Sequence, residues 1–190
     1  MTLKRISLFF YFFFLISCKN NTETNIALEY QKKSNELITQ IASEIEDCSC
    51  IIEPEKNKTL LQTLSEENPT QDYKKLMKDA LNIKDDSLFN KLNNLTANYK
   101  IDLSLNNQKY LLIEQIELES ILQNHKEREK LNIMIKKCPK GWLNFSPPIF
   151  NKNFDKAVIP ITNFPDGKLI VYKYENGKWN RFKLLTNWIS

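Results

Sequence analysis

Apolar residues recur at steps of three and four along most of the chain up to Cys138, which is the spacing of amphipathic helices. The clearest case runs from Asn25 to Asp47, where polar and charged residues separate Ile26, Tyr30, Leu37, Ile38, Ile41 and Ile45. Similar spacing predicts further helices over Thr59–Ser65, from a Thr70 cap to Leu81, after an Asp85 or Asp86 cap, over Leu118–His125 and over Leu131–Cys138. Two short apolar runs, Cys48–Glu53 and Lys109–Glu117, favour strands. A strand through Leu131, Ile133 and Ile135 is the alternative to the last helix.

After Pro139 the pattern changes to the alternation and turn residues of antiparallel strands. We expect strands over Leu143–Ser146, Ile149–Asn151, Ala157–Thr162, Leu169–Glu175 and Lys178–Thr186. Asn176-Gly177 is the strongest kind of short hairpin signal, and a two-residue loop there fixes the register. It places Tyr174 opposite Trp179, Tyr172 opposite Arg181, Val171 opposite Phe182 and Leu169 opposite Leu184. The predicted fold class is therefore α+β, with a helical part over 26–138 packed on a small antiparallel sheet over 139–190.

The predicted hairpin has two different faces. One is apolar, through Leu169, Val171, Phe182 and Leu184, and the other is aromatic and basic, through Ile170, Tyr172, Tyr174, Trp179, Arg181 and Lys183. Tyr172, Tyr174, Trp179 and Arg181 form a candidate binding face for a glycan, a peptide or a lipid headgroup, because they offer stacking area and charge. A sheet covered by helices on both sides would bury the aromatic residues instead, and we favour this second arrangement.

The amino terminus has the pattern of an export signal. Lys4-Arg5 precedes an apolar run from Ile6 to Ile16, which is too short to cross a membrane as a helix, since crossing takes about 20 apolar residues. The run ends in Leu15-Ile16-Ser17-Cys18, which resembles the lipobox of bacterial lipoproteins. The resemblance implies that residues 1–17 are removed and that Cys18 then carries the acyl chains, such as palmitate, that anchor the chain to a membrane of the cell envelope. We expect the outer membrane; an ordinary cleaved signal is the alternative.

The mature chain of 173 residues fits one domain, over 26–190, which follows a polar tether over 18–25. Without Lys4 and Arg5, 25 basic residues stand against 23 acidic ones, so the net charge is +2 and nucleic-acid binding loses its electrostatic basis. The three glycines lie far apart, which excludes a glycine-rich phosphate loop. The expected partners are therefore the membrane, through the lipid on Cys18, and an envelope protein or glycan.

Three cysteines follow Cys18, namely Cys48, Cys50 and Cys138. Cys48 and Cys50 are too close together to favour a disulfide with each other. Because an exported chain can keep disulfides, we expect one of the two to pair with Cys138. Cys50 is slightly favoured if the strand through Ile51-Ile52 carries it into the core. Such a disulfide closes a loop of roughly 90 residues, and the chain-entropy model then gives a stabilisation of the folded state of more than about 4 kcal/mol.

No combination of residues predicts a catalytic, metal or cofactor site. The spacings of Cys48, Cys50, Cys138 and His125 do not match those of zinc ligands, and His125 is expected on an apolar helix face. We expect Glu114, Glu117 and Glu119 on a solvent-exposed, charged edge of the domain. The common hydrolase motifs are absent. We therefore expect a non-enzymatic binding or structural role. The alternatives are an envelope enzyme that uses carboxylates or a free thiol, and an inhibitor or immunity-type partner protein.

Several stretches resemble a group of small, uncharacterised bacterial lipoproteins. These are Cys48-Ser49-Cys50-Ile51-Ile52-Glu53, Cys138-Pro139, Phe145-Ser146-Pro147-Pro148-Ile149-Phe150-Asn151-Lys152 and Glu175-Asn176-Gly177-Lys178-Trp179. The resemblance implies an envelope location and a domain that closes with the hairpin at Asn176-Gly177. It transfers no catalytic residue, because the group has no assigned activity. Related chains carry further cysteines where this chain has Ile161 to Pro165, so a second disulfide is not expected here.

Overall fold

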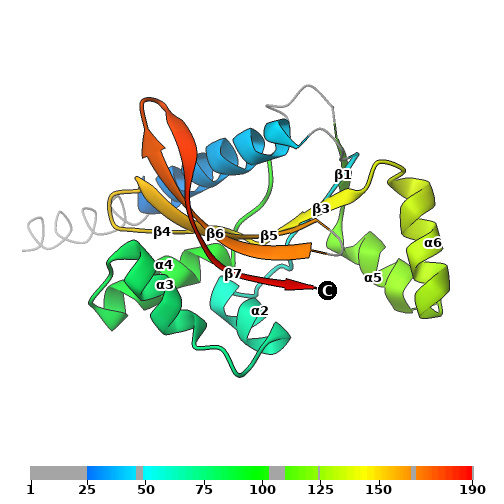
Figure 1. Ribbon diagram of the computed structural model, residues 1–190, viewed down its shortest axis with the longest axis horizontal. Coiled ribbons are helices and arrows are strands. Elements are labelled where there is room, and N and C mark those ends of the chain that lie inside the picture. The colour runs from blue at the N-terminus through cyan, green and yellow to red at the C-terminus, as the bar shows by residue number, and fades with distance from the viewer. Residues whose placement is uncertain (1–24, 46–48, 103–109, 124, 164–165, 190) are drawn as a thin grey trace, which may run out of the picture.

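The computed structural model describes residues 25–45, 49–102, 110–123, 125–163 and 166–189 (Figure 1). The helices are residues 25–44, α2 (Leu60–Glu67), α3 (Tyr73–Leu81), α4 (Asp86–Thr96), α5 (Gln115–Gln123) and α6 (Glu127–Lys137). The strands are β1 (Cys50–Ile52), β2 (Leu111–Ile113), β3 (Trp142–Phe145), β4 (Ile149–Phe150), β5 (Lys156–Asn163), β6 (Asp166–Glu175) and β7 (Lys178–Ile189). The predicted α+β fold class is confirmed. The predicted signal peptide over 1–17, and the tether up to residue 24, lie outside the described residues.

The strands that the structure describes form a mixed sheet in the order β2-β1-β3-β5-β6-β7, and β4 pairs with β5. Along β3, β5, β6 and β7 each strand is antiparallel to its neighbour, as predicted. β1 lies between β2 and β3 and pairs with both in the parallel sense, so the helical half also contributes two strands to the sheet. Parallel neighbours require a long crossover, and the helices α2–α4 and α5–α6 provide the two crossovers.

The hairpin between β6 and β7 turns at Asn176 and Gly177, whose φ angles are 55° and 80°. Positive φ at both positions is what a type I′ turn requires. The predicted pairs of Tyr174 with Trp179 and of Tyr172 with Arg181 are confirmed.

The rest of the predicted register is wrong. Val171 lies opposite Lys183 and Leu169 opposite Thr186, because the register shifts between Val171 and Tyr172 and again between Leu169 and Ile170. A bulge adds an unpaired residue to one strand, and alternation along a single strand does not reveal it. Phe182, which was expected on the buried apolar face, is 54% exposed as a result.

Helices cover both faces of the sheet. In Figure 1 the 25–44 helix lies on one side of the sheet, and α2, α3 and α4 lie on the other. The core on the first side joins the helix to the hairpin through Tyr30, Leu37, Ile38, Ile41, Phe150, Ile170, Tyr172 and Trp179. The second core contains Leu60, Met77, Phe89, Val158, Leu169 and Val171. Tyr172 and Trp179 are only 5% and 2% exposed, so they are core residues and not part of a surface that a partner can contact.

Side-chain caps set the ends of the helices on the second side. Thr59 forms a capping box with Gln62 at the start of α2, and Asp85 caps α4 by accepting from the N–H of Ser87. Asp72, not Thr70, caps α3, since its carboxylate accepts from the N–H of Lys75. The Thr70 hydroxyl is instead bonded to Asn68 in the turn before the helix.

A third, smaller core lies where α5 and α6 meet the short parallel strands. It contains Cys50, Ile52, Ile113, Met134 and Cys138, and a disulfide joins Cys50 to Cys138 with a Cα–Cα distance of 5.6 Å. α6 is a helix and not the alternative strand, and Cys138 caps its last turn. The predicted strand over Lys109–Glu117 is shorter than expected, because α5 already begins at Gln115. Cys48 lies outside the described residues.

Candidate functional site

A cleft of about 870 Å³ opens at one end of the sheet. Its walls are the turn from α3 into α4, the loop between β4 and β5, and the adjoining ends of β5 and β6. The lining residues are Leu81, Asn82, Ile83, Lys84, Asp85, Leu88, Asn151, Lys152, Asn153, Asp155, Lys156, Lys173, Tyr174 and Glu175. Sites for small molecules typically measure about 300–1,000 Å³, so the cleft has the size of a ligand site.

Asn151 holds the β4–β5 loop in one conformation. Its Oδ1 accepts from the backbone N–H groups of Asp155 and Lys156, at 3.2 Å each, and its Nδ2 donates to the Asp155 carboxylate at 2.6 Å. Phe154 has a φ of 54°, a conformation that a bulky residue adopts only where its surroundings enforce it. Its ring packs 5.3 Å from that of Phe150 in the core. The loop therefore places Lys156 at a fixed position beside the cleft.

The opposite wall is the turn that joins α3 to α4. Asn82 ends α3 in the left-handed conformation, with a φ of 56°. Three residues later, the carboxylate of Asp85 is occupied as the cap of α4, at 2.8 Å from the N–H of Ser87. Lys84 lies between them and is exposed. The short turn therefore presents the ammonium group of Lys84, while the adjacent carboxylate of Asp85 is already bonded to the N–H of Ser87.

Four lysines line the cleft: Lys84, Lys152, Lys156 and Lys173. Among the described residues, none of the four takes part in an ion pair. Lys156 and Lys173 lie directly opposite each other on β5 and β6, and like charges in this position destabilise a sheet. The carboxylates of Asp85, Asp155 and Glu175 also line the cleft, so its lining has one net positive charge.

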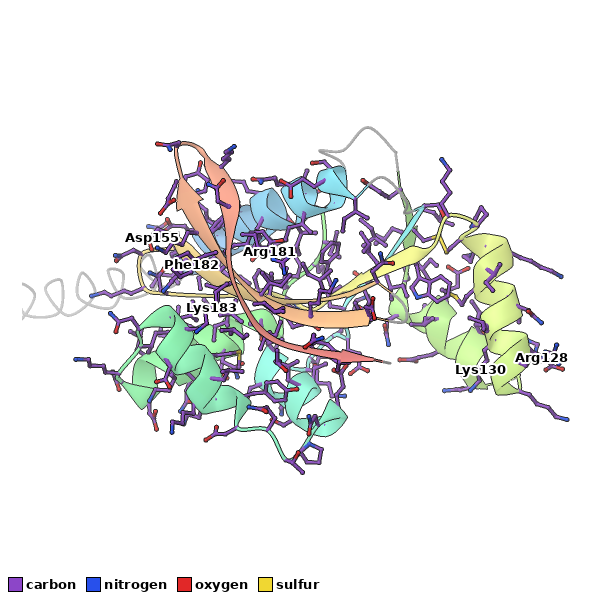
Figure 2. The ribbon with its side chains drawn as sticks, viewed as in Figure 1. Arg128, Lys130, Asp155, Arg181, Phe182 and Lys183 are labelled. Atoms are coloured by element: carbon purple, nitrogen blue, oxygen red, sulfur yellow. A yellow bond between two sulfur atoms is a disulfide. The ribbon has the colours of Figure 1, made fainter. Side chains whose placement is uncertain are left out.

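The exposed ring of Phe182 lies next to the lysine pair. The Nζ of Lys173 is 3.7 Å from the centre of the ring, and the Nζ of Lys156 is 5.5 Å from it. A ring face attracts cations, so Phe182 orients both ammonium groups without neutralising their charge. Figure 2 shows Phe182 on β7, with Arg181 and Lys183 beside it and Asp155 at the neighbouring loop. The bulge that exposes Phe182 therefore also positions the cations.

Of the candidate binding face, the structure brings Tyr174 to the cleft. The Nζ of Lys33 lies 4.1 Å from the centre of the Tyr174 ring, and Arg181 is exposed on β7. The sequence did not indicate the cleft lined by Lys84, Lys152, Lys156 and Lys173, called the lysine cleft below. These residues come from three separate segments of the chain. A correct strand register would have revealed the Lys156–Lys173 pair, which is the one signal that the chain carries for it.

The other candidate residues do not converge on the cleft. The side chain of His125 is 42% exposed and lies 3.7 Å from Glu129, so the prediction of an apolar surrounding was wrong. Glu114, Glu117 and Glu119 are exposed, and Glu117 accepts from Lys137 at 2.5 Å. Within the part of the chain that the structure describes, no group of three His, Cys, Asp or Glu residues could hold a metal ion. Cys18 lies outside that part.

A comparison with known proteins finds no family model, no curated protein and no solved structure that matches the chain. None of the helices within the described ranges has both the length and the apolar character needed to cross a membrane. The geometry of the cleft and the pattern of the amino terminus are thus the two starting points for a function.

Proposed function

We propose that the chain is a lipid-anchored protein of the bacterial cell envelope that binds a small anionic ligand in the lysine cleft, without catalysis. The observation that carries the binding role is the Lys156–Lys173 pair, two cations directly opposite each other with no carboxylate partner among the described residues. The repulsion between the two ammonium groups is unfavourable, and a bound anion would offset it. The export-signal pattern at the start of the sequence supports the envelope location, with Cys18 as the lipidated residue.

A lysine is a compact point charge, so the cleft selects for negative charge more than for a particular shape of the charged group. Phosphate and carboxylate groups both satisfy this requirement, and hydrogen bonds between charged groups are roughly twice as strong as neutral ones. Asn82 and Asn153 add amide groups for the uncharged part of a ligand. The cleft therefore fits a polar molecule with an anionic end.

Calorimetric titration of the full chain in detergent micelles with glycerol phosphate tests the binding role, and glycerol is the uncharged control. We expect saturable heat with glycerol phosphate, no heat with glycerol, and weaker binding at high salt, because screening reduces the attraction. Equal binding of the two compounds, or binding of neither, would contradict the proposal.

The anchor is tested separately by fractionation of cells that express the chain with Cys18→Ala. We expect wild type in the membrane fraction and the variant in the soluble fraction, because two or three acyl chains anchor a protein durably and none remain without the thiol. Cys48→Ala is the matched control and should stay in the membrane fraction. A Cys18→Ala variant that remains membrane-bound would exclude the lipid anchor.

A further inference from the structure

We propose that the outer edge of β7 binds an extended, acidic polypeptide segment, which adds a strand to the sheet. β7 is the last strand in the sheet order, and within the described part of the chain the backbone of residues 181–187 pairs only with β6. Unpaired N–H and C=O groups along a strand edge are a template for another strand, and several kinds of peptide-binding domain recognise their ligands in this way. The edge is separate from the lysine cleft, because Arg181 and Lys183 do not line the cleft.

The start of β7 shows which of its backbone groups point outward. Gln40 binds the N–H and the carbonyl of Trp179, so both of these groups face away from β6. Backbone groups alternate in direction along a strand, and Arg181 is therefore the next residue whose N–H and carbonyl face outward. Gln40 satisfies the edge at Trp179 alone and leaves it open from Arg181 onward.

The open part of the edge is also uncovered on both faces. Arg181, Phe182, Lys183 and Leu184 are four successive exposed residues, and successive side chains of a strand point to opposite faces. Phe182 is 54% exposed and Leu184 is 40% exposed. Figure 2 shows Arg181, Phe182 and Lys183 on this strand. An added strand would therefore find apolar side chains and cations beside the unpaired backbone.

The two cations lie on different faces of the sheet. Arg181 is opposite Tyr172, which belongs to the core beneath the first helix. Lys183 is opposite Val171, which belongs to the core on the other side. Side chains of directly opposite residues share a face, so each face has one cation at this edge. Consecutive acidic residues in an added strand would place a carboxylate on each face.

The surroundings leave both cations available. β7 itself contains no acidic residue over Lys178–Ile189. Among the described residues neither Arg181 nor Lys183 forms an ion pair, and Glu44 at the end of the first helix is bonded to Gln40 at 2.8 Å. The charge at the edge is therefore complementary to an acidic strand.

A second copy of the chain fits this edge less well. Two paired β7 strands would bring Arg181 and Lys183 of both copies together, and like charges at neighbouring positions destabilise a sheet. β7 also has an extra residue at Phe182 and at Leu185, where its register with β6 shifts. Bulges and edge cations are devices that prevent pairing between sheet edges of identical chains. Only the bulges act against a strand of opposite charge, and the cations attract it.

The test measures the fluorescence anisotropy of dye-labelled peptides that are titrated with the full chain in detergent micelles. A peptide of sequence TVEEVT with blocked ends should bind saturably. The peptide TVQQVT, which lacks the charges, should bind at least about fivefold more weakly, because exposed ion pairs contribute modestly. A third peptide keeps both glutamates but is N-methylated along its backbone, so it cannot pair with a strand edge, and it should also bind at least about fivefold more weakly.

Variants of the chain locate the binding site. Arg181→Gln combined with Lys183→Gln should weaken binding of TVEEVT by about fivefold or more, and the fold is kept because both residues are exposed. Lys75→Gln combined with Lys140→Gln removes the same charge from exposed positions outside β7, and this control should bind like wild type.

Equal binding of TVEEVT and TVQQVT, undiminished binding of the N-methylated peptide, or an unchanged affinity in the variant of Arg181 and Lys183 would overturn the proposal. Absence of binding by all three peptides would also overturn it. None of these results bears on the titrations with glycerol phosphate, since neither residue lines the lysine cleft.

Discussion

Gln40 binds the backbone of Trp179 with both groups of its side-chain amide. Its Nε2 donates to the Trp179 carbonyl at 2.6 Å, and its Oε1 accepts from the Trp179 N–H at 2.8 Å. β7 is the last strand in the sheet order, so its outer backbone groups have no neighbouring strand to pair with. Gln40 takes the place of that strand at one residue and fixes the start of β7 to the 25–44 helix. The hairpin that carries Phe182 and Lys173 is thereby held against the body of the domain.

Replacing Gln40 by alanine should lower the free energy of unfolding by about 1–3 kcal/mol, because two hydrogen bonds to a partly buried backbone are lost. Urea unfolding of the two forms measures the difference. Gln123→Ala, at an exposed position of α5, is the matched control and should change stability by less than about 0.5 kcal/mol. Equal stability of Gln40→Ala and wild type would show that water replaces the amide without cost.

The disulfide between Cys50 and Cys138 links β1 to the end of α6 across 88 residues of chain. Replacing both cysteines by alanine should lower the free energy of unfolding by about 2–5 kcal/mol, as for other native disulfides that close long loops. Thermal melting with and without a reductant provides the measurement. The reductant should lower the midpoint of wild type and leave that of the double variant unchanged; a drop of the same size in both would mean that the bond is not present in the folded chain.

Two kinds of signal in the sequence predicted the fold correctly. Helical spacing of apolar residues located the first helix, and Asn176-Gly177 located the hairpin, because both signals depend on neighbours close in sequence. The register beyond Tyr172 was wrong, because bulges follow from packing between strands. The parallel pairing of β1 was not foreseen, since a run of three buried residues does not specify its neighbours.

The same dependence on tertiary packing explains which functional residues the sequence predicted and which it missed. Tyr174 was predicted as part of a binding face and does line the cleft, whereas Tyr172 and Trp179 are buried beneath the first helix. Lys156 and Lys173 are separated by a whole hairpin in sequence and become neighbours only through strand pairing. Sites of this kind depend on the tertiary arrangement, so composition and spacing gave no sign of them.

Partial burial, together with the charge of Glu55, raises the pKa of Glu67, and the raised pKa predicts a pH-dependent effect on stability. Because its folded-state pKa lies above the ordinary value of 4.5, the folded chain binds the proton more tightly than the unfolded chain. The resulting destabilisation is absent below the unfolded-state pKa and develops as the pH rises through the raised folded-state pKa. Glu67→Gln should therefore be more stable than wild type at neutral pH, and the difference should vanish in acid.

Urea unfolding across this pH range measures the effect of Glu67. Glu66→Gln is the matched control on the same helix, and it should not gain stability, because Glu66 is paired with Lys58. A loss of stability in Glu67→Gln at neutral pH would contradict the prediction.

Binding of glycerol phosphate to the lysine cleft is decided by one calorimetric comparison of three forms of the chain. Wild type should bind, and the double variant Lys156→Ala with Lys173→Ala should lose at least about tenfold in affinity, equivalent to about 1.4 kcal/mol. Lys168→Ala removes an exposed lysine from β6 that does not line the cleft, and it should bind like wild type. Equal affinity in all three forms would show that the Lys156–Lys173 pair does not bind the anion.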